Sequence, residues 1–206
     1  MAELASEAVA DVGAFLARLV RLDPGALVRL RPAGPEATAL WARLPFDVLA
    51  TRLIRSPLAE DATVRAGELL AALERGETAL PGRHDVAWRS PLPPEASEVV
   101  ERVPAAEVRR VALAAAATIR AAVASLGVGE RRLRDELLDH VAMIVTHGDR
   151  REEVPVRLVQ GVVRMGFLGA DDTSVRVRAA AGGWLGLEAT YGCAWRRVAP
   201  GLRLLS

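Results

Sequence analysis

The sequence predicts an α+β fold in which helices pack on antiparallel β-hairpins, and two patterns within residues 153–197 support this. Apolar residues recur at helical spacing over 158–167, and Gly166 supplies a stop. Residues 175–178 read Val-Arg-Val-Arg, an alternation with period two that is typical of a half-buried strand, and Gly182-Gly183 makes a turn. This segment therefore predicts a helix followed by a two-stranded hairpin, with the helix beginning at the acidic pair Glu152-Glu153 and Pro155.

The return strand of this hairpin is expected to run without a break from Trp184 to about Trp195. Its odd positions form an apolar face toward the core: Leu185, Leu187, Ala189, Tyr191, Cys193 and Trp195. Pairing with the first strand then places four larger or charged side chains on the opposite face: Arg176, Arg178, Trp184 and Glu188.

An earlier segment repeats the pattern. A helix ends near Leu22, residues 28–31 read Val-Arg-Leu-Arg, and a second strand begins near Thr38 and carries Trp41 on the arginine side. We hypothesise two copies of a helix-plus-hairpin unit, related by a pseudo-twofold axis. The alternative is that two hairpins of an arginine-rich chain resemble each other by chance.

The remaining elements follow from caps, glycine stops and periodicity. Residues 46–54 continue the first hairpin as a strand or form a short helix. Asp61-Ala62-Thr63 is a plausible cap for a helix that ends at Gly76. The other expected helices span residues 3–22, 105–126 and 130–146.

Proline and glycine separate two lobes in this reading. We expect an N-terminal α+β lobe over residues 1–80 and a proline-rich linker over 81–104. A C-terminal helical lobe ending in a hairpin would span 105–206. Trp88 and Leu92 of the linker are expected to pack on a lobe surface.

Composition bounds the class of protein. The chain has 206 residues, 51% of them hydrophobic, with a net charge of +1, which favours a globular chain with no overall field toward nucleic acid or membranes. All basic residues other than histidine are arginine, and lysine and asparagine are absent, as in a GC-rich bacterial genome. One cysteine and an N-terminus with Glu3 and Glu7 but no basic region predict a cytoplasmic protein without a secretory signal. No apolar run is long enough to span a bilayer.

A surface that combines arginine with tryptophan is the first candidate site. Exposed tryptophan and arginine are typical anchors of protein interfaces, and the two can also stack as cation–π pairs. The predicted surface consists of Arg29, Arg31, Trp41, Arg176, Arg178 and Trp184. It favours a non-catalytic binding or regulatory protein that contacts another protein or a second copy of itself. The alternative is that these arginines cover the tryptophans within one chain and pair with Glu188.

A second reading concerns residues 130–197, whose order of helix, helix and hairpin resembles the winged-helix DNA-binding domains. The resemblance implies a recognition helix that ends at Met165-Gly166-Phe167-Leu168, with Arg157, Gln160 and Arg164 exposed to read bases. Arg176 and Arg178 would then hold phosphates. The nearby acidic residues and the lack of a dense basic patch depart from the usual footprint.

A metal-dependent hydrolase is the weakest alternative. Acidic and histidine side chains gather in one stretch, namely Asp135, Glu136, Asp139, His140, His147 and Asp149. Glu136 and His140 share a helix face at a spacing of four, yet no HExxH motif or third ligand accompanies them. We therefore expect no metal site, no cofactor and no catalytic residues, and Cys193 is expected to be buried and inert.

Overall fold

The computed structural model describes residues 3–126, 130–148 and 150–198, with the backbone alone for 123–126, 130–134, 147 and 150. The N-terminal half begins with a short 3₁₀ turn. Its elements are η1 (Ser6–Ala8), α1 (Val9–Leu22), β1 (Leu27–Pro32), β2 (Thr38–Leu44), β3 (Val48–Ile54), β4 (Ala62–Arg65), α2 (Ala66–Glu74) and η2 (Asp85–Ala87).

The C-terminal half contains more helix and a second, smaller sheet. Its elements are β5 (Ser97–Pro104), α3 (Ala105–Leu126), α4 (Glu130–Asp139), β6 (Val141–His147), β7 (Arg150–Pro155), α5 (Val156–Arg164), β8 (Ser174–Ala180), β9 (Trp184–Ala189) and β10 (Gly192–Arg197). The fold class is therefore α+β, as expected. None of the described helices is both long and apolar enough to cross a membrane.

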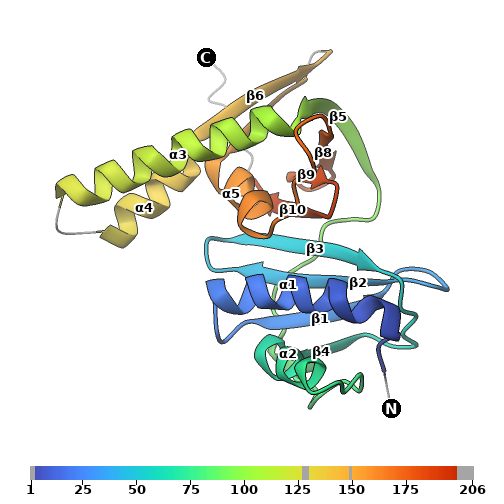
Figure 1. The fold of residues 1–206 in the computed structure, drawn as a ribbon. Coiled ribbons are helices and arrows are strands. Elements are labelled where there is room, and N and C mark those ends of the chain that lie inside the picture. Colours follow the sequence, from blue (N-terminus) through green and yellow to red (C-terminus); the bar gives the residue numbers. More distant parts are fainter. Residues whose placement is uncertain (1–2, 127–129, 149, 199–206) are drawn as a thin grey trace.

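One antiparallel sheet of eight strands joins the two halves, in the order β4-β1-β2-β3-β10-β9-β8-β5. The helices cover one face: Figure 1 shows α1 in front of β1–β3 and α5 in front of β10. The strands of the two halves meet where β3 pairs with β10, through Leu49, Ala50 and Thr51 opposite Trp195, Ala194 and Cys193.

The two halves have the same arrangement about this junction. In each, a helix is followed by three consecutive antiparallel strands, α1-β1-β2-β3 and α5-β8-β9-β10. In each half a further strand pairs on the outer edge and leads into a helix: β4 leads into α2 after β3, whereas β5 leads into α3 and precedes α5 in the chain. The expected repeat of helix and hairpin is thus present, with three strands per unit instead of two, and its strand order is that of a pseudo-twofold axis at the junction.

The prediction of one continuous return strand from Trp184 to about Trp195 is wrong. A turn at Thr190-Tyr191 divides it into β9 and β10. The turn changes the alternation, so Leu187 and its partner Ala194 face the helices. Cys193 and Trp195 instead lie on the opposite face with Trp184. The predicted faces of β8 and of the first hairpin are confirmed, with Arg29 opposite Trp41 and Arg176 opposite Glu188.

Three other predicted elements change. Residues 48–54 form strand β3, and the helix expected over 130–146 ends at Asp139, after which 141–147 form β6. The cap expected at Asp61-Ala62-Thr63 begins strand β4. The helix expected from Glu152-Glu153 instead begins at Val156, with Pro155 as its N-cap and β7 before it. The range 81–104 contains η2 and the edge strand β5.

A continuous hydrophobic core spans the junction. Phe15 of the α1 half and Phe167 of the α5 half stack with ring centroids 6.3 Å apart and an interplanar angle of 18°. Helix α5 approaches the junction closely at Gly161, where an added Cβ would lie 2.9 Å from Val48 Cγ1 and 3.3 Å from Ala194 Cβ. Glycine at this position lets helix and sheet pack together.

Candidate functional site

The sheet face that the helices do not cover carries a cluster of tryptophans, here called the tryptophan face. Leu49, Trp184, Cys193 and Trp195 are buried in it, and Trp41 packs at its edge. Residues 81–96, here called the strap, cross this face between the two halves, and its Trp88 and Leu92 pack on the cluster. The expectation that Trp88 and Leu92 lie on a lobe surface is therefore confirmed.

Hydrogen bonds to β4 fasten the strap at its start. His84 donates its backbone N–H to Thr63 O at 2.6 Å, and Thr63 N–H donates to Asp85 Oδ1 at 2.7 Å. This bond, together with Arg83, holds the pKa of Asp85 below its usual value. Arg29 lies 6.0 Å from the Trp88 ring centroid. These contacts explain why a proline-rich segment follows one path across the sheet.

The predicted arginine and tryptophan residues share this face, but most of the arginines pair with acidic residues of the same chain. Arg176 and Arg178 both pair with Glu188, at 2.7 and 2.6 Å. Trp184 is only 8% exposed. Arg29 pairs with Asp61 at 2.8 Å. Within the described part of the chain, Arg31 is exposed and has no ion pair, and the cation–π contact of this face joins Arg29 to Trp88 instead of Trp41 or Trp184.

The proposed recognition helix is not exposed, which corrects the winged-helix expectation. Arg157 and Gln160 of α5 are only 5% and 4% exposed. Gln160 donates to Ala112 O of α3 at 3.1 Å, so it stabilises the packing of the two helices. Arg164 is exposed, with its guanidinium 5.6 Å from the Phe46 ring centroid. Two of the three expected base-reading side chains therefore lie in the interior, because α5 is packed between the sheet and α3.

A pocket of about 260 Å³, here called the tryptophan pocket, opens at one end of the tryptophan face. Its apolar wall consists of Val48, Leu49, Pro91, Trp184 and Trp195. Its polar wall consists of Arg43, Asp47, Arg89, Ser90, Arg196 and Arg197. The polar wall contains four arginines and one aspartate, so the tryptophan pocket combines an apolar floor with a positively charged rim.

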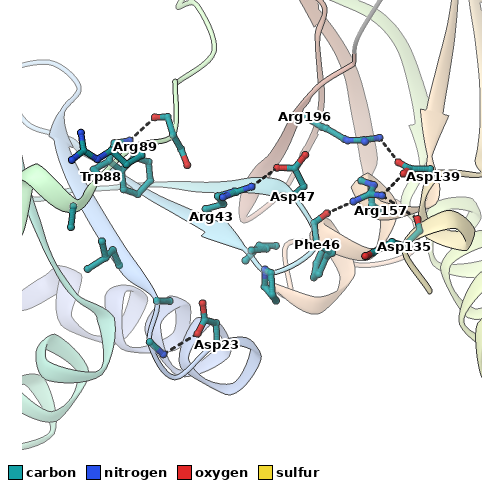
Figure 2. A pocket seen from close by; sticks show the side chains of 17 residues that line it. Asp23, Arg43, Phe46, Asp47, Trp88, Arg89, Asp135, Asp139, Arg157 and Arg196 are labelled. Atoms are coloured by element: carbon teal, nitrogen blue, oxygen red, sulfur yellow. Dashed lines mark hydrogen bonds and ion pairs between the residues drawn. The ribbon is translucent and has the colours of Figure 1, made fainter. Parts of the chain in front are cut away.

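A larger cavity of about 750 Å³, here called the junction cavity, lies around the β2–β3 turn from this pocket. Figure 2 shows its walls: the α1–β1 turn with Asp23, the β2–β3 turn with Arg43 and Asp47, the strap with Trp88 and Arg89, and α4, α5 and β10 with Asp139, Arg157 and Arg196. The two hollows share five residues, namely Arg43, Asp47, Arg89, Ser90 and Arg196, so they adjoin, and together they are here called the groove.

Two arginines share one carboxylate in the deepest wall of this groove. Arg157 Nη2 lies 2.5 Å from Asp139 Oδ2, and Arg196 Nη1 lies 2.8 Å from Asp139 Oδ1. Arg157 Nη1 also donates to Phe46 O at 2.7 Å. Among the described residues, the buried Nε atoms of Arg157 and Arg196 have no hydrogen-bond partner. The pair therefore has hydrogen-bonding capacity that the described residues do not use.

A third hollow of about 700 Å³ lies on the far side of Trp195 and is lined by the Arg178–Glu188 pair. Arg52 borders it, pairing with Asp11 at 2.6 Å and lying 5.9 Å from the Tyr191 ring centroid. Four of its five charged side chains, namely Asp11, Arg52, Arg178 and Glu188, therefore already have partners within the chain.

Among the described residues, those considered for metal binding do not gather into one site, and the cysteine considered for nucleophilic chemistry is buried. No three described His, Cys, Asp or Glu side chains lie close enough to hold a metal ion. Asp139 of the candidate acidic stretch pairs with arginines, while the side chain of His147 and the whole of Asp149 lie outside the described residues. Burial raises the pKa of the Cys193 thiol well above its usual value, and Glu188 raises it further.

Sequence reasoning missed the groove residues Arg43, Arg89 and Arg196, and it considered Asp139 only within the acidic stretch of the possible metal site. Arg43 and Arg89 look like isolated surface charges in the sequence, and Asp139 looks like part of a solvated helix face. The available signal was Phe46-Asp47 between two apolar alternations, which marks a tight turn. Asp47 indeed has a positive φ of 60° there.

Two protein families match this chain, one in each half. A family described as domain of unknown function DUF8185 matches residues 92–201, more than half of the chain. The chain belongs to the DUF8185 family. A second family, domain of unknown function DUF8010, matches residues 3–90. The two matches meet within the strap, so the DUF8185 region holds the second half of the sheet. No curated protein is similar enough to count as a match.

Solved structures similar to this DUF8185 protein are DNA polymerase sliding clamps. The chain aligns over its full length with the sliding clamp of Caulobacter crescentus, at a TM-score of 0.62 and 12% identity, covering 67% of that chain. The clamp of Bartonella birtlesii bound to griselimycin gives 0.58 and 11%, with 98% and 65% of the two chains covered. DNA polymerase III subunit beta from Pseudomonas aeruginosa gives 0.58 and 10%, with 98% and 65% covered.

These similarities establish the fold alone. The DUF8185 protein has a sliding-clamp-like fold with two similar domains, built on a large antiparallel sheet with packed helices. It spans about two thirds of the length of the clamps that it resembles. At this identity, function must be argued from the groove.

Proposed function

We propose that this protein is a non-catalytic docking protein that binds a partner protein through the tryptophan face. The observation that carries the proposal is the tryptophan pocket, where Trp184 and Trp195 form an apolar wall beside four arginines. Aromatic and arginine side chains in a concave pocket are the usual anchors of protein interfaces. The surrounding sheet is rigid, so the pocket is formed before a partner arrives.

The fold supports this proposal. The similar structures are described as clamps of DNA polymerase, and one of them is described as bound to griselimycin. Proteins with this fold can therefore act with a polymerase and bind ligands. In this chain, the proposed lobes are residues 1–80 and 105–206, with 81–104 connecting them through the strap and β5. Self-association of the chain is part of the proposal, and light-scattering mass measurement tests it.

Selection of peptides tests the docking function directly. A phage-displayed library of random peptides would be panned against the whole chain, and the enriched peptides would be titrated by calorimetry into wild type and Arg89→Glu. Arg89 is exposed and has no partner among the described residues, so reversing its charge leaves the fold intact. The matched control is Arg120→Glu, an exposed arginine of α3, which lies on the helix-covered side of the sheet.

We expect enriched peptides whose binding weakens about tenfold in Arg89→Glu and is unchanged in Arg120→Glu, since a charge-assisted contact contributes about 1.5–3 kcal/mol. Failure to enrich any peptide, or equal binding by all three proteins, would contradict the proposal.

Association with duplex DNA is the second candidate, and the clamp-like fold is the observation that favours it. The described helices carry mixed charges, for example Arg110 paired with Glu107 on α3 and Arg65 paired with Glu68 at α2. The candidate therefore requires an assembled ring in place of a basic surface on one chain. Duplex binding that falls steeply with salt would support it, and no binding at low salt would exclude it.

A further inference from the structure

Resting on the proposed docking function, we infer that the partner segment is an acidic peptide with an apolar anchor. The anchor occupies the tryptophan pocket. A neighbouring carboxylate occupies the junction cavity, where it binds Arg157 and Arg196 in competition with Asp139. The protein thus selects partners by a carboxylate placed close to an apolar side chain.

The buried arginines are the first reason. Arg157 is only 5% exposed, yet its guanidinium shares a single carboxylate with Arg196. A guanidinium binds a carboxylate best through two parallel N–H groups, and both Nε atoms are without a partner among the described residues. A second carboxylate can satisfy these donors, whereas an apolar ligand would leave them buried and unpaired.

The accessibility of Asp139 is the second reason. Its side chain is 48% exposed, while those of Arg157 and Arg196 are 6% and 20% exposed. The carboxylate therefore lies on the open side of the arginines, in the place that an incoming acidic group would take. Because Asp139 is the last residue of α4, its displacement needs no change in α5 or β10.

Charge along the groove sets the position of the acidic group. The tryptophan pocket has four arginines and one aspartate, and that aspartate, Asp47, already pairs with Arg43 at 2.9 Å. The junction cavity is lined by four arginines and four aspartates. Asp47 and Asp139 pair with arginines, Asp135 lies beside Arg157, and Asp23 accepts a hydrogen bond from Gly25 N–H at the opposite wall. An acidic residue beside the anchor is therefore favoured, and one that reaches the Asp23 wall is not.

The experiment uses the enriched peptides and one isosteric variant, Asp139→Asn. Each peptide is compared with its own Asp→Asn or Glu→Gln version, by calorimetry, on wild type and on Asp139→Asn. Asn fills the same space but does not compete as a carboxylate. Thermal melting of the variant confirms that it is folded, and Arg89→Gln serves as a second, fold-neutral variant that weakens the cationic rim.

We expect the enriched peptides to carry Asp or Glu near an aromatic or aliphatic residue, and removal of that charge to weaken binding about tenfold. Asp139→Asn should tighten the acidic peptides by a similar factor and leave the amide versions unchanged. Enriched peptides without an acidic residue, or acidic peptides that Asp139→Asn does not tighten, would overturn the inference while leaving the docking function standing. Absence of any enriched peptide would overturn both.

Discussion

The two helix-and-strand units have the same strand order but differ in how deeply the polar residues of their helices are buried. Helix α1 lies on the sheet with one side open, and its Asp11 pairs with Arg52 while remaining 56% exposed. Helix α5 lies between the sheet and helices α3 and α4, so Arg157 and Gln160 are buried. The same sequence period thus gives a surface helix in one half and an interior helix in the other.

The extra layer over α5 explains where the groove forms. Polar groups on a surface helix are satisfied by water, whereas those on a covered helix need partners within the protein. The Nη atoms of Arg157 bind Phe46 O, Asp135 O and the Asp139 carboxylate, whereas its Nε has no hydrogen-bond partner among the described residues. Among the residues that the structure describes, the buried cation is therefore Arg157 of the second half, and it lies beside a cavity.

The largest effect is expected where the two halves touch. Phe167→Ala removes a fully buried ring that stacks on Phe15, which should lower the free energy of unfolding by about 4 kcal/mol. Because the core is continuous, near-UV and far-UV circular dichroism should report one shared transition in wild type. Separate transitions for the two probes would show that the halves fold as independent domains.

The next largest effects are expected from arginine substitutions, which should cost more at the buried Arg157 of the α5 half than at the exposed Arg43 of the α1 half. Arg157→Ala leaves Phe46 O and Asp139 without a buried cation and should lower the free energy of unfolding by about 3 kcal/mol. Arg43→Ala breaks an ion pair whose side chains are 62% and 60% exposed, and should cost at most about 1 kcal/mol. Urea unfolding measures both, and equal losses would contradict the difference in burial.

Each of the two helices also contains one glycine, which gives a paired test. An added Cβ at Gly161 would lie 2.9 Å from Val48, so Gly161→Ala should cost about 2 kcal/mol. Gly13 has no neighbour within 4 Å, so Gly13→Ala should gain up to about 1 kcal/mol from helix propensity. A gain at both positions would mean that α5 does not approach the junction as closely as described.

The smallest effect is expected at acidic pH, where protonation of Asp85 should loosen the strap. The pKa of Asp85 is lowered in the folded protein, so its contribution is present above the unfolded value and is lost as pH falls through the lower, folded value. We expect tryptophan fluorescence to change below the usual aspartate range as Trp88 loosens, before global unfolding. Asp85→Asn should abolish this early step, and an unchanged profile in that variant would assign the step to another group.

Much of the sheet was predictable because a period of two is a local signal. The alternation at 28–31 and 175–178 correctly placed arginines opposite the core. The failures arose where two patterns coincide: Leu137, Val141 and Ile144 fit a helix, yet 141–147 form β6 after the chain turns at His140. The β-branched residues Val141, Ile144, Val145 and Thr146 were the neglected signal for a strand.

The groove was beyond local reasoning because its parts come from distant segments. The β2–β3 turn, the strap, α4, α5 and β10 meet only after the sheet has joined both halves. Similarly, Gly192 after Thr190-Tyr191 indicated a turn, but only pairing with β3 shows that Trp195 faces the strap. Sequence patterns assign faces within a segment, and long-range pairing decides what each face contacts.

The most direct test of the docking groove is nuclear magnetic resonance of the tryptophan indoles during titration with an enriched peptide. The four indole N–H signals report Trp41, Trp88, Trp184 and Trp195 separately. We predict that Trp184 and Trp195 shift with the peptide and that the shifts follow the calorimetric affinity. Saturating peptide that leaves both signals unmoved would place binding elsewhere on the chain and contradict the account.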